Sequence, residues 1–166
     1  MVAQITTGKG AAMNTQSSFH GAAVLPEKEL IGSHRFPSRK QENPKGYFIR
    51  EATSADCQVV YDLICEMEET ELPFKAFRCI YFKQVTNPRY ECLVYEEQGR
   101  VLGVINIRYE HQLHHAASIA EIMEFSVDSS VRSKGIGKLL FDAACDHARN
   151  SGCIQIEVAC NQLRTK

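Results

Sequence analysis

The sequence predicts a single α/β domain with a mixed, mainly antiparallel sheet flanked by helices, preceded by a polar N-terminal segment. Two observations support this prediction. Along residues 47–160, apolar residues recur at helical spacing in some segments and at strand spacing in others, in the order strand, two helices, three strands, helix, strand. Residues 1–46 instead are rich in Gly, Ser, Thr, Asn, Gln and Pro, and no period is sustained there.

The N-terminal segment is expected to be a disordered tail. Residues 1–46 hold six basic and three acidic side chains, a charge of +3, and few apolar ones. Too little apolar surface is present to offset the entropy of ordering such a chain. The alternative function for this segment is a basic arm that contacts a partner. The domain itself is expected over residues 47–166.

The first half of the domain is predicted as a strand followed by two helices. Tyr47-Phe-Ile-Arg has the composition of a short strand, and Thr53 or Ser54 can cap the helix after it. An apolar stripe at three- and four-residue spacing defines that helix as far as Met67. A second helix is expected over Phe74–Val85, because prolines bound it at positions 73 and 88.

The second half is predicted as a hairpin, a third strand, a helix and a last strand. The hairpin strands are residues 90–95 and 101–109, around the turn Glu97-Gln-Gly-Arg100. The third strand covers residues 118–127. The helix runs from Ile136 to about Ser151, where Gly152 can stop it in the left-handed conformation. The last strand is expected at residues 154–160.

Composition excludes several function classes. The 166 residues carry a formal charge of −1, which argues against a protein held on nucleic acid or on an acidic membrane by bulk charge. No apolar stretch approaches the ~20 residues that span a bilayer. The seven cysteines contain no C-x-x-C pair and are expected to be reduced thiols. We therefore expect a cytoplasmic protein without a nucleic-acid or membrane partner.

A glycine-bearing loop between the third strand and the following helix carries the chemistry. Free N–H groups at a helix start, together with the positive end of the helix dipole, form an anion site. Glycine allows the backbone to approach a phosphate, and basic side chains add charge-assisted contacts. The residues expected to surround a pyrophosphate are Arg132, Ser133, Lys134, Gly135, Ile136, Gly137 and Lys138.

The pattern Arg132-x-x-Gly135-x-Gly137, after the strand end Phe125-Ser-Val127-Asp, resembles the acetyl-CoA-binding motif of the GNAT superfamily of N-acetyltransferases. The resemblance covers about residues 47–161 and implies the GNAT acyltransferase fold with acetyl-CoA as cosubstrate. It implies that the loop amides hold the CoA pyrophosphate. It also implies that the backbone of Phe125 and Val127 pairs with the pantetheine arm, near Asn161.

Three short stretches are similar to the aminoalkylphosphonate N-acetyltransferases in particular. They are Tyr61-Asp-Leu-Ile-Cys-Glu66, Ala76-Phe-Arg78 and Gln112-Leu-His-His115. This resemblance implies a small anionic amine as the acceptor substrate and suggests dependence on a divalent metal. Arg78 and His114 are the residues that we expect to contact the acceptor. Each has an ordinary alternative, a solvated helix face for Arg78 and a polar loop of neutral histidines for His114.

Acetyl transfer requires a group that accepts the proton of the attacking amine. The third strand offers Glu121 and Glu124, and Ala120-Glu-Ile122 resembles the segment that carries the general base in histone-acetylating members. We therefore rank Glu121 first and Glu124 second. Three residues apart, the two glutamates face opposite sides of a regular strand, and the bulge that the family has here would change this.

The family pattern continues beyond Lys166 with a helix and further strands, so the chain is expected to be C-terminally incomplete, with its last strand as an exposed edge. The main functional hypothesis is acetyl transfer from acetyl-CoA to a primary amine. The alternatives are a GNAT enzyme acting on another amine, such as a polyamine or a protein N-terminus, and a non-catalytic acetyl-CoA-binding module. A homodimer is compatible with the sequence.

Overall fold

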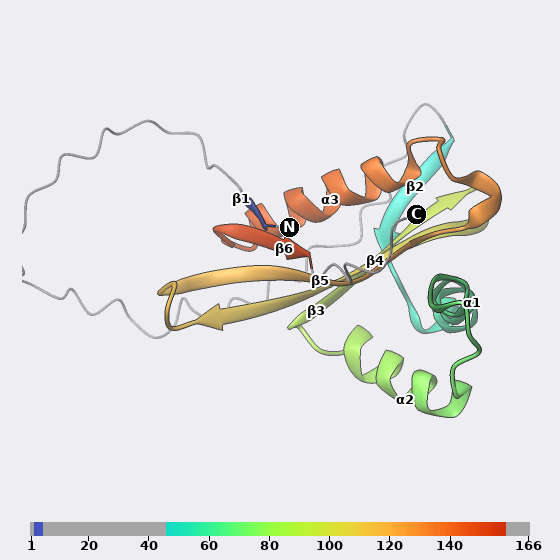
Figure 1. Cartoon of the computed structure of the whole chain (residues 1–166), viewed down its shortest axis with the longest axis horizontal. Helices are drawn as coiled ribbons and strands as arrows, with labels where there is room; N and C mark the ends of the chain where they lie inside the picture. Colours follow the sequence, from blue (N-terminus) through green and yellow to red (C-terminus); the bar gives the residue numbers. More distant parts are fainter. Residues whose placement is uncertain (1, 5–45, 159–166) are drawn as a thin grey trace, which may run out of the picture.

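The computed structural model describes residues 2–4 and 46–158 (Figure 1). Within these ranges one sheet has the strand order β1-β6-β5-β4-β3-β2. All neighbouring strands are antiparallel except β5 and β6, which are parallel. The elements are β1 (Val2–Gln4), β2 (Tyr47–Glu51), η1 (Ser54–Asp56), α1 (Cys57–Glu68), α2 (Phe74–Val85), β3 (Tyr90–Glu97), β4 (Arg100–Gln112), β5 (Ala117–Val127), η2 (Ser129–Val131), α3 (Ile136–Asn150) and β6 (Gln155–Val158).

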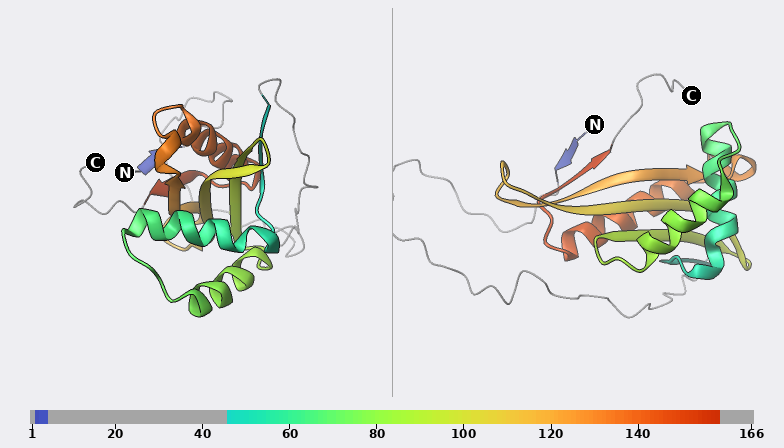
Figure 2. Two further views of the ribbon diagram at one scale, coloured as in Figure 1. Left: turned by 90° about the vertical axis from the view of Figure 1, so that its right-hand side faces the viewer. Right: turned by 90° about the horizontal axis from the view of Figure 1, so that it is seen from below.

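Helices cover both faces of the sheet, with α3 on one face and α1 and α2 on the other (Figure 2). The alternation of side chains along β4 separates the two cores. Ile105 and Ile107 pack with α3, whereas Val104 packs with α1 and α2. The predicted fold class, a mixed and mainly antiparallel sheet flanked by helices, is confirmed.

The element boundaries follow local signals in the sequence. Thr53 and Asp56 form a capping box at η1, just before α1. The turn between β3 and β4 has positive φ at Gln98 (52°) and Gly99 (75°), which matches the twist of a tight hairpin. Gly152, with φ 77°, follows the end of α3 as predicted.

Strand β5 contains a β-bulge, which determines which face of the sheet its glutamates lie on. The register with β4 pairs Asn106 with Glu124 but Ile107 with Ile122, so Met123 is an extra residue without a partner on β4. Because of this extra residue, the side chains that follow Met123 point to the opposite face of the sheet from the one they would have in a regular strand.

The N-terminus contributes a strand where the sequence predicted none. Residues 2–4 form β1, which pairs antiparallel with Gln155–Glu157 of β6. The expectation that β6 is an exposed edge is therefore wrong, because β1 supplies partners for its backbone groups. The rest of the expected tail, residues 1 and 5–45, lies outside the described residues, as does the end of the predicted strand at positions 159–160. Among the described helices, none is long and apolar enough to cross a membrane.

Candidate active site

The start of α3 presents a row of backbone N–H groups at the end of β5. The first helical bond is donated by Leu139 N–H to the Gly135 carbonyl, at 3.1 Å, and the N-cap Gly135 has no side chain to cap the helix. The N–H groups of residues 135–138 therefore lack acceptors among the described residues. Ser133 (φ 66°) and Gly135 (φ 84°) turn the chain into this position. The geometry is that of an anion site.

Two glycines set how closely α3 approaches the sheet. A Cβ on Gly103 of β4 would lie 2.9 Å from Leu140 Cδ1, so any larger residue here would require the Leu140 side chain or the helix to shift. A Cβ on Gly137 would meet Phe125 and Val127 of β5 at the ordinary distances of 3.5 and 3.9 Å. Gly103 was not singled out from the sequence, because only a long-range contact reveals its role.

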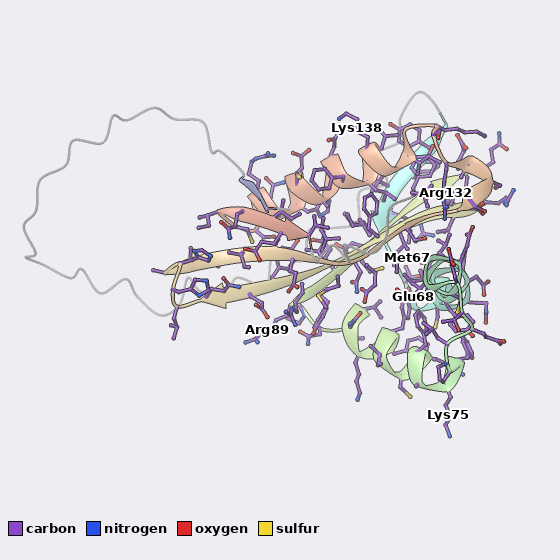
Figure 3. The ribbon with its side chains drawn as sticks, in the orientation of Figure 1. Met67, Glu68, Lys75, Arg89, Arg132 and Lys138 are labelled. Carbon is purple, nitrogen blue, oxygen red and sulfur yellow. The ribbon has the colours of Figure 1, made fainter. Side chains whose placement is uncertain are left out.

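The basic side chains of the loop are arranged differently from one another. Arg132 turns back onto β5, where its Nε donates to the Val127 carbonyl at 3.2 Å, and its guanidinium lies 3.9 Å from Glu66. Lys138 is exposed on the outer side of α3, paired with Asp142 (Figure 3). Lys134 is exposed. Arg132 thus ties the loop to the strand, while the lysines lie at the surface.

Next to this loop, one edge of β5 has no partner strand among the described residues. Pairing with β6 extends only over Ala120–Ile122, opposite Ile156–Val158. Along Met123–Val127, none of the described residues forms a strand on that side. An extended ligand arm can add to such an edge as a strand does. Phe125 and Val127, the residues predicted to contact the pantetheine arm, lie in this segment, and Asn161 lies outside the described residues.

The bulge places both candidate bases on one face. Glu124 is opposite Asn106 and Glu121 is opposite Arg108, and these two partners lie two positions apart on β4. Residues at that spacing share a face, which is the face covered by α1 and α2. The prediction that the glutamates share a face only if the strand is bulged is confirmed.

The two glutamates differ in their surroundings. Glu121 is bound to Arg108 at 2.6 Å, and Arg108 also contacts Glu110 at 2.9 Å. Glu124 forms no ion pair with a cation of the described residues. Its Oε2 accepts a hydrogen bond of 2.7 Å from Asn106 Nδ2. Burial raises the pKa of the Glu124 carboxyl, the Asn106 hydrogen bond opposes this rise, and the nearby charge of Glu68 adds to it.

A cavity of about 170 Å³ lies between α1, α2 and the sheet, and Glu124 is part of its lining. Asn106 joins Glu124 to the cavity's second polar side chain, Gln84, by donating to Gln84 Oε1 at 2.9 Å. Asn106 Oδ1 is buried and accepts no hydrogen bond from the described residues. Neither amide was predicted as a site residue, because each lies in a segment whose apolar pattern predicts only a helix or a strand.

The residues predicted to contact the acceptor lie away from this cavity. Arg78 is exposed on α2, where its guanidinium stacks 5.4 Å from the centre of the Phe82 ring. His114 is exposed in the β4–β5 turn, 4.1 Å from the His115 ring. His111 contacts Ser118 Oγ at 2.8 Å. In the described part of the chain no group of three or more His, Cys, Asp or Glu side chains is placed to hold a metal ion.

Comparison with known proteins relates this site to acetyl transfer. Residues 57–165 match the model of the acetyltransferase (GNAT) family. The curated aminoalkylphosphonate N-acetyltransferase of Salmonella typhimurium strain LT2 is 34% identical over 116 residues, which are 70% of this chain and 75% of the relative.

Solved structures show the same fold at lower identity. A possible acetyltransferase from Clostridium difficile 630 superposes with a TM-score of 0.63 at 22% identity, covering 72% of this chain and 82% of the other. Glucosamine-6-phosphate N-acetyltransferase from Arabidopsis thaliana gives 0.61 at 20% identity, with coverages of 70% and 83%. The family match, the curated relative and the anion site at the start of α3 agree: this chain belongs to the GNAT family of acetyltransferases.

Proposed function

We propose that the chain transfers the acetyl group of acetyl-CoA to a primary amine, with Glu124 as the group that accepts the amine proton. The observation that carries this assignment is the Glu124 carboxyl, which is half-buried, lines the cavity with no cation from the described residues beside it, and has a raised pKa. A carboxylate whose pKa is raised toward neutrality is a stronger proton acceptor than a solvated one.

In the proposed reaction the unpaired N–H groups of residues 135–138 bind the CoA pyrophosphate, and the open edge of β5 aligns the pantetheine arm. The neutral amine attacks the thioester carbonyl carbon, the C–S bond breaks, and CoA leaves as the thiolate. Glu124 has by then accepted one proton from the ammonium form of the amine, so the extra proton on the amide nitrogen passes to the leaving thiolate, which becomes the CoA thiol. Because an alkylamine has a pKa of about 10.4, its neutral form costs roughly 4–5 kcal/mol at pH 7, and a buried carboxylate lowers this part of the barrier.

Glu121, which the sequence ranked first, fits this role less well. Its carboxylate already accepts from the Arg108 guanidinium at 2.6 Å. To take up a proton, Glu121 would have to give up much of that ion pair. We therefore propose that Glu121 positions Arg108 and that Glu124 is the base.

For the acceptor, the name of the Salmonella relative supports an aminoalkylphosphonate, in agreement with the sequence prediction. A second candidate is a primary amine without an anionic group, which is favoured by the absence of Lys, Arg and His from the cavity lining. Contacts of Arg78 and His114 with the acceptor, dependence on a divalent metal, a disordered tail before Tyr47 and a homodimer remain predictions.

The proposal is tested by thiol release from acetyl-CoA across a panel of primary amines, with wild type, Glu124→Gln and Glu121→Gln. Removing a general base typically lowers kcat by about 10²- to 10⁴-fold, so we expect that loss for Glu124→Gln and less than about tenfold for Glu121→Gln. Titration calorimetry with CoA is the control, and both variants should bind as wild type does. The reverse order of the two kcat losses would identify Glu121 as the base. CoA binding without turnover of any amine would support the non-catalytic module instead.

A further inference from the structure

The lining of the cavity beside Glu124 has a large apolar part and a small polar part. Nine of its twelve lining side chains are apolar, and the other three, Gln84, Asn106 and Glu124, are joined to one another by hydrogen bonds. One apolar lining residue, Ile80, is 56% exposed, so the cavity reaches the surface beside α2. The apolar lining consists of Val60, Ile64, Leu72, Phe77, Ile80, Tyr81, Val85, Cys92 and Val104.

The polar side chains of the cavity leave one buried acceptor, Asn106 Oδ1, without a hydrogen-bond donor in the described part of the chain. Asn106 uses its amide N–H groups for Gln84 and Glu124, which leaves the buried Oδ1 without a donor. The second carboxylate oxygen of Glu124 accepts no hydrogen bond from the described residues either, although, unlike Asn106 Oδ1, it is not fully buried. A buried acceptor without a partner costs about 1–3 kcal/mol. A ligand that brings two or three N–H donors would satisfy these oxygens, and a primary amine is such a ligand.

The apolar part of the cavity determines what the rest of the ligand can be. No Lys, Arg or His lines it, and Glu68 adds a further negative charge near Glu124. An anionic group placed here would be desolvated beside carboxylates without a counter-ion. Arg108, on the same face of β4, is already bound by two carboxylates.

The volume sets the size of the ligand. An apolar cavity of about 150 Å³ accommodates benzene, and this cavity has about 170 Å³. A benzyl group or a branched C5 alkyl group therefore fills it, and a second ammonium at the far end, as in a diamine, would have no partner among the apolar side chains.

From these contacts we propose that the acceptor is a primary amine with a compact apolar body of about the size of a benzene ring, whose amine lies between Glu124 and Asn106. This inference rests on the proposed function and names the acceptor class of the same site. It assigns the apolar surfaces of α1 and α2 the role of binding the carbon body of the acceptor.

The first test compares kcat/KM for benzylamine, 3-methylbutylamine, 2-aminoethylphosphonate and putrescine at one acetyl-CoA concentration. We expect the two apolar amines to exceed the phosphonate and the diamine by at least about tenfold, since a cavity without matching polar groups rejects a charged substituent. A preference for 2-aminoethylphosphonate over benzylamine would overturn the cavity assignment while leaving the proposed function intact. Failure of every amine, with CoA still bound, would refute the proposed function and the inference with it.

A variant pair tests whether this cavity is the acceptor site. Ile80→Lys places a cation at the mouth of the cavity, on a residue exposed enough for the substitution to be tolerated. It should lower kcat/KM for benzylamine by roughly tenfold, as expected when an apolar contact is lost, and leave CoA binding unchanged. Cys79→Lys is the matched control, because Cys79 is exposed on α2 next to Ile80 but does not line the cavity. Equal effects of the two lysines would place the acceptor elsewhere.

Discussion

The two glycines at the start of α3 are predicted to respond in opposite ways to an added methyl group. At Gly135 the backbone has φ 84°, and a Cβ would meet nothing within 4 Å, so the cost of Gly135→Ala is backbone strain alone. At Gly137 the φ angle is ordinary, and a Cβ would contact Phe125 Cζ at 3.5 Å and Val127 Cγ2 at 3.9 Å.

These geometries give a magnitude for each variant. A non-glycine residue in the left-handed region costs roughly 1–2 kcal/mol, which lowers Tm by about 4–8 °C at about 4 °C per kcal/mol. If Gly135→Ala also distorts the row of N–H groups, one charge-assisted hydrogen bond to the pyrophosphate is lost. Such a bond contributes about 1.5–3 kcal/mol, so its loss weakens CoA binding by about 10- to 150-fold. Gly137→Ala should instead gain about 0.5–1 kcal/mol of helix propensity and bind CoA within about twofold of wild type.

The assay is thermal unfolding with and without CoA, together with calorimetry of CoA binding, on both alanine variants. The reasoning predicts two separate roles, a left-handed cap at Gly135 and helix–strand packing at Gly137. If both variants lost CoA affinity alike, a phosphate would have to approach Gly137 as closely as Gly135. If neither lost affinity, the start of α3 would not be the pyrophosphate site.

Three other variants or treatments test separate parts of the structure. Gly103→Ala should lower Tm by roughly 4–12 °C, because its Cβ would lie 2.9 Å from Leu140 Cδ1 and overpacking costs about 1–3 kcal/mol; an unchanged Tm would contradict close packing there. The hydrogen bond to Glu91 raises the pKa of His147 although burial opposes it, so its stabilisation is complete below about pH 6.5 and is lost as pH rises through the folded pKa. Stability measured from pH 6 to 9 should therefore fall more steeply in wild type than in His147→Asn, and equal slopes would show that His147 contributes nothing. His111, His114 and His115 are the candidate ligands for the divalent metal that the family resemblance suggests, and an unchanged rate after chelation would remove that role.

The helices and the cofactor loop could be predicted because their signals are local. Apolar spacing marked α1, prolines bounded α2, and the sequence Gly135-Ile-Gly137 marked the start of α3. Each signal acts within a few residues, through capping, helix periodicity or the conformational freedom of glycine. The positive φ at Gly135 and Gly152 agrees with such local reasoning.

The sequence could not show which of the two glutamates is the better candidate base, because this depends on contacts across the sheet. Arg108 and Glu121 are thirteen residues apart and meet only in the β4–β5 register. Glu124 is half-buried because α1 and α2 cover that face of the sheet. No residue type in the segment around Met123 indicates a bulge, since a bulge differs from a regular strand only in its pairing with the neighbouring strand.

Strand β1 was missed for a related reason. Three residues, Val2–Gln4, are too few to show a period, and they lie in a segment whose overall composition predicts disorder. Their pairing is explained by β6, whose free edge provides donors and acceptors for an added strand. The partner, and not the segment's own sequence, determines the structure there.

The bulge at Met123 shows how one strand could contribute to both proposed substrate sites. In a regular strand, positions 121 and 124 face opposite sides of the sheet, so only one of the two carboxylates could face α1 and α2. The extra residue brings Glu124 to that face while the following segment, up to Val127, keeps an edge that β6 does not pair with. The proposed acceptor cavity thus lies on a face of β5, and the proposed cofactor arm lies along its edge, within the same few residues. In the proposed site, a single backbone irregularity therefore places the candidate base next to the strand edge that is proposed to hold the thioester.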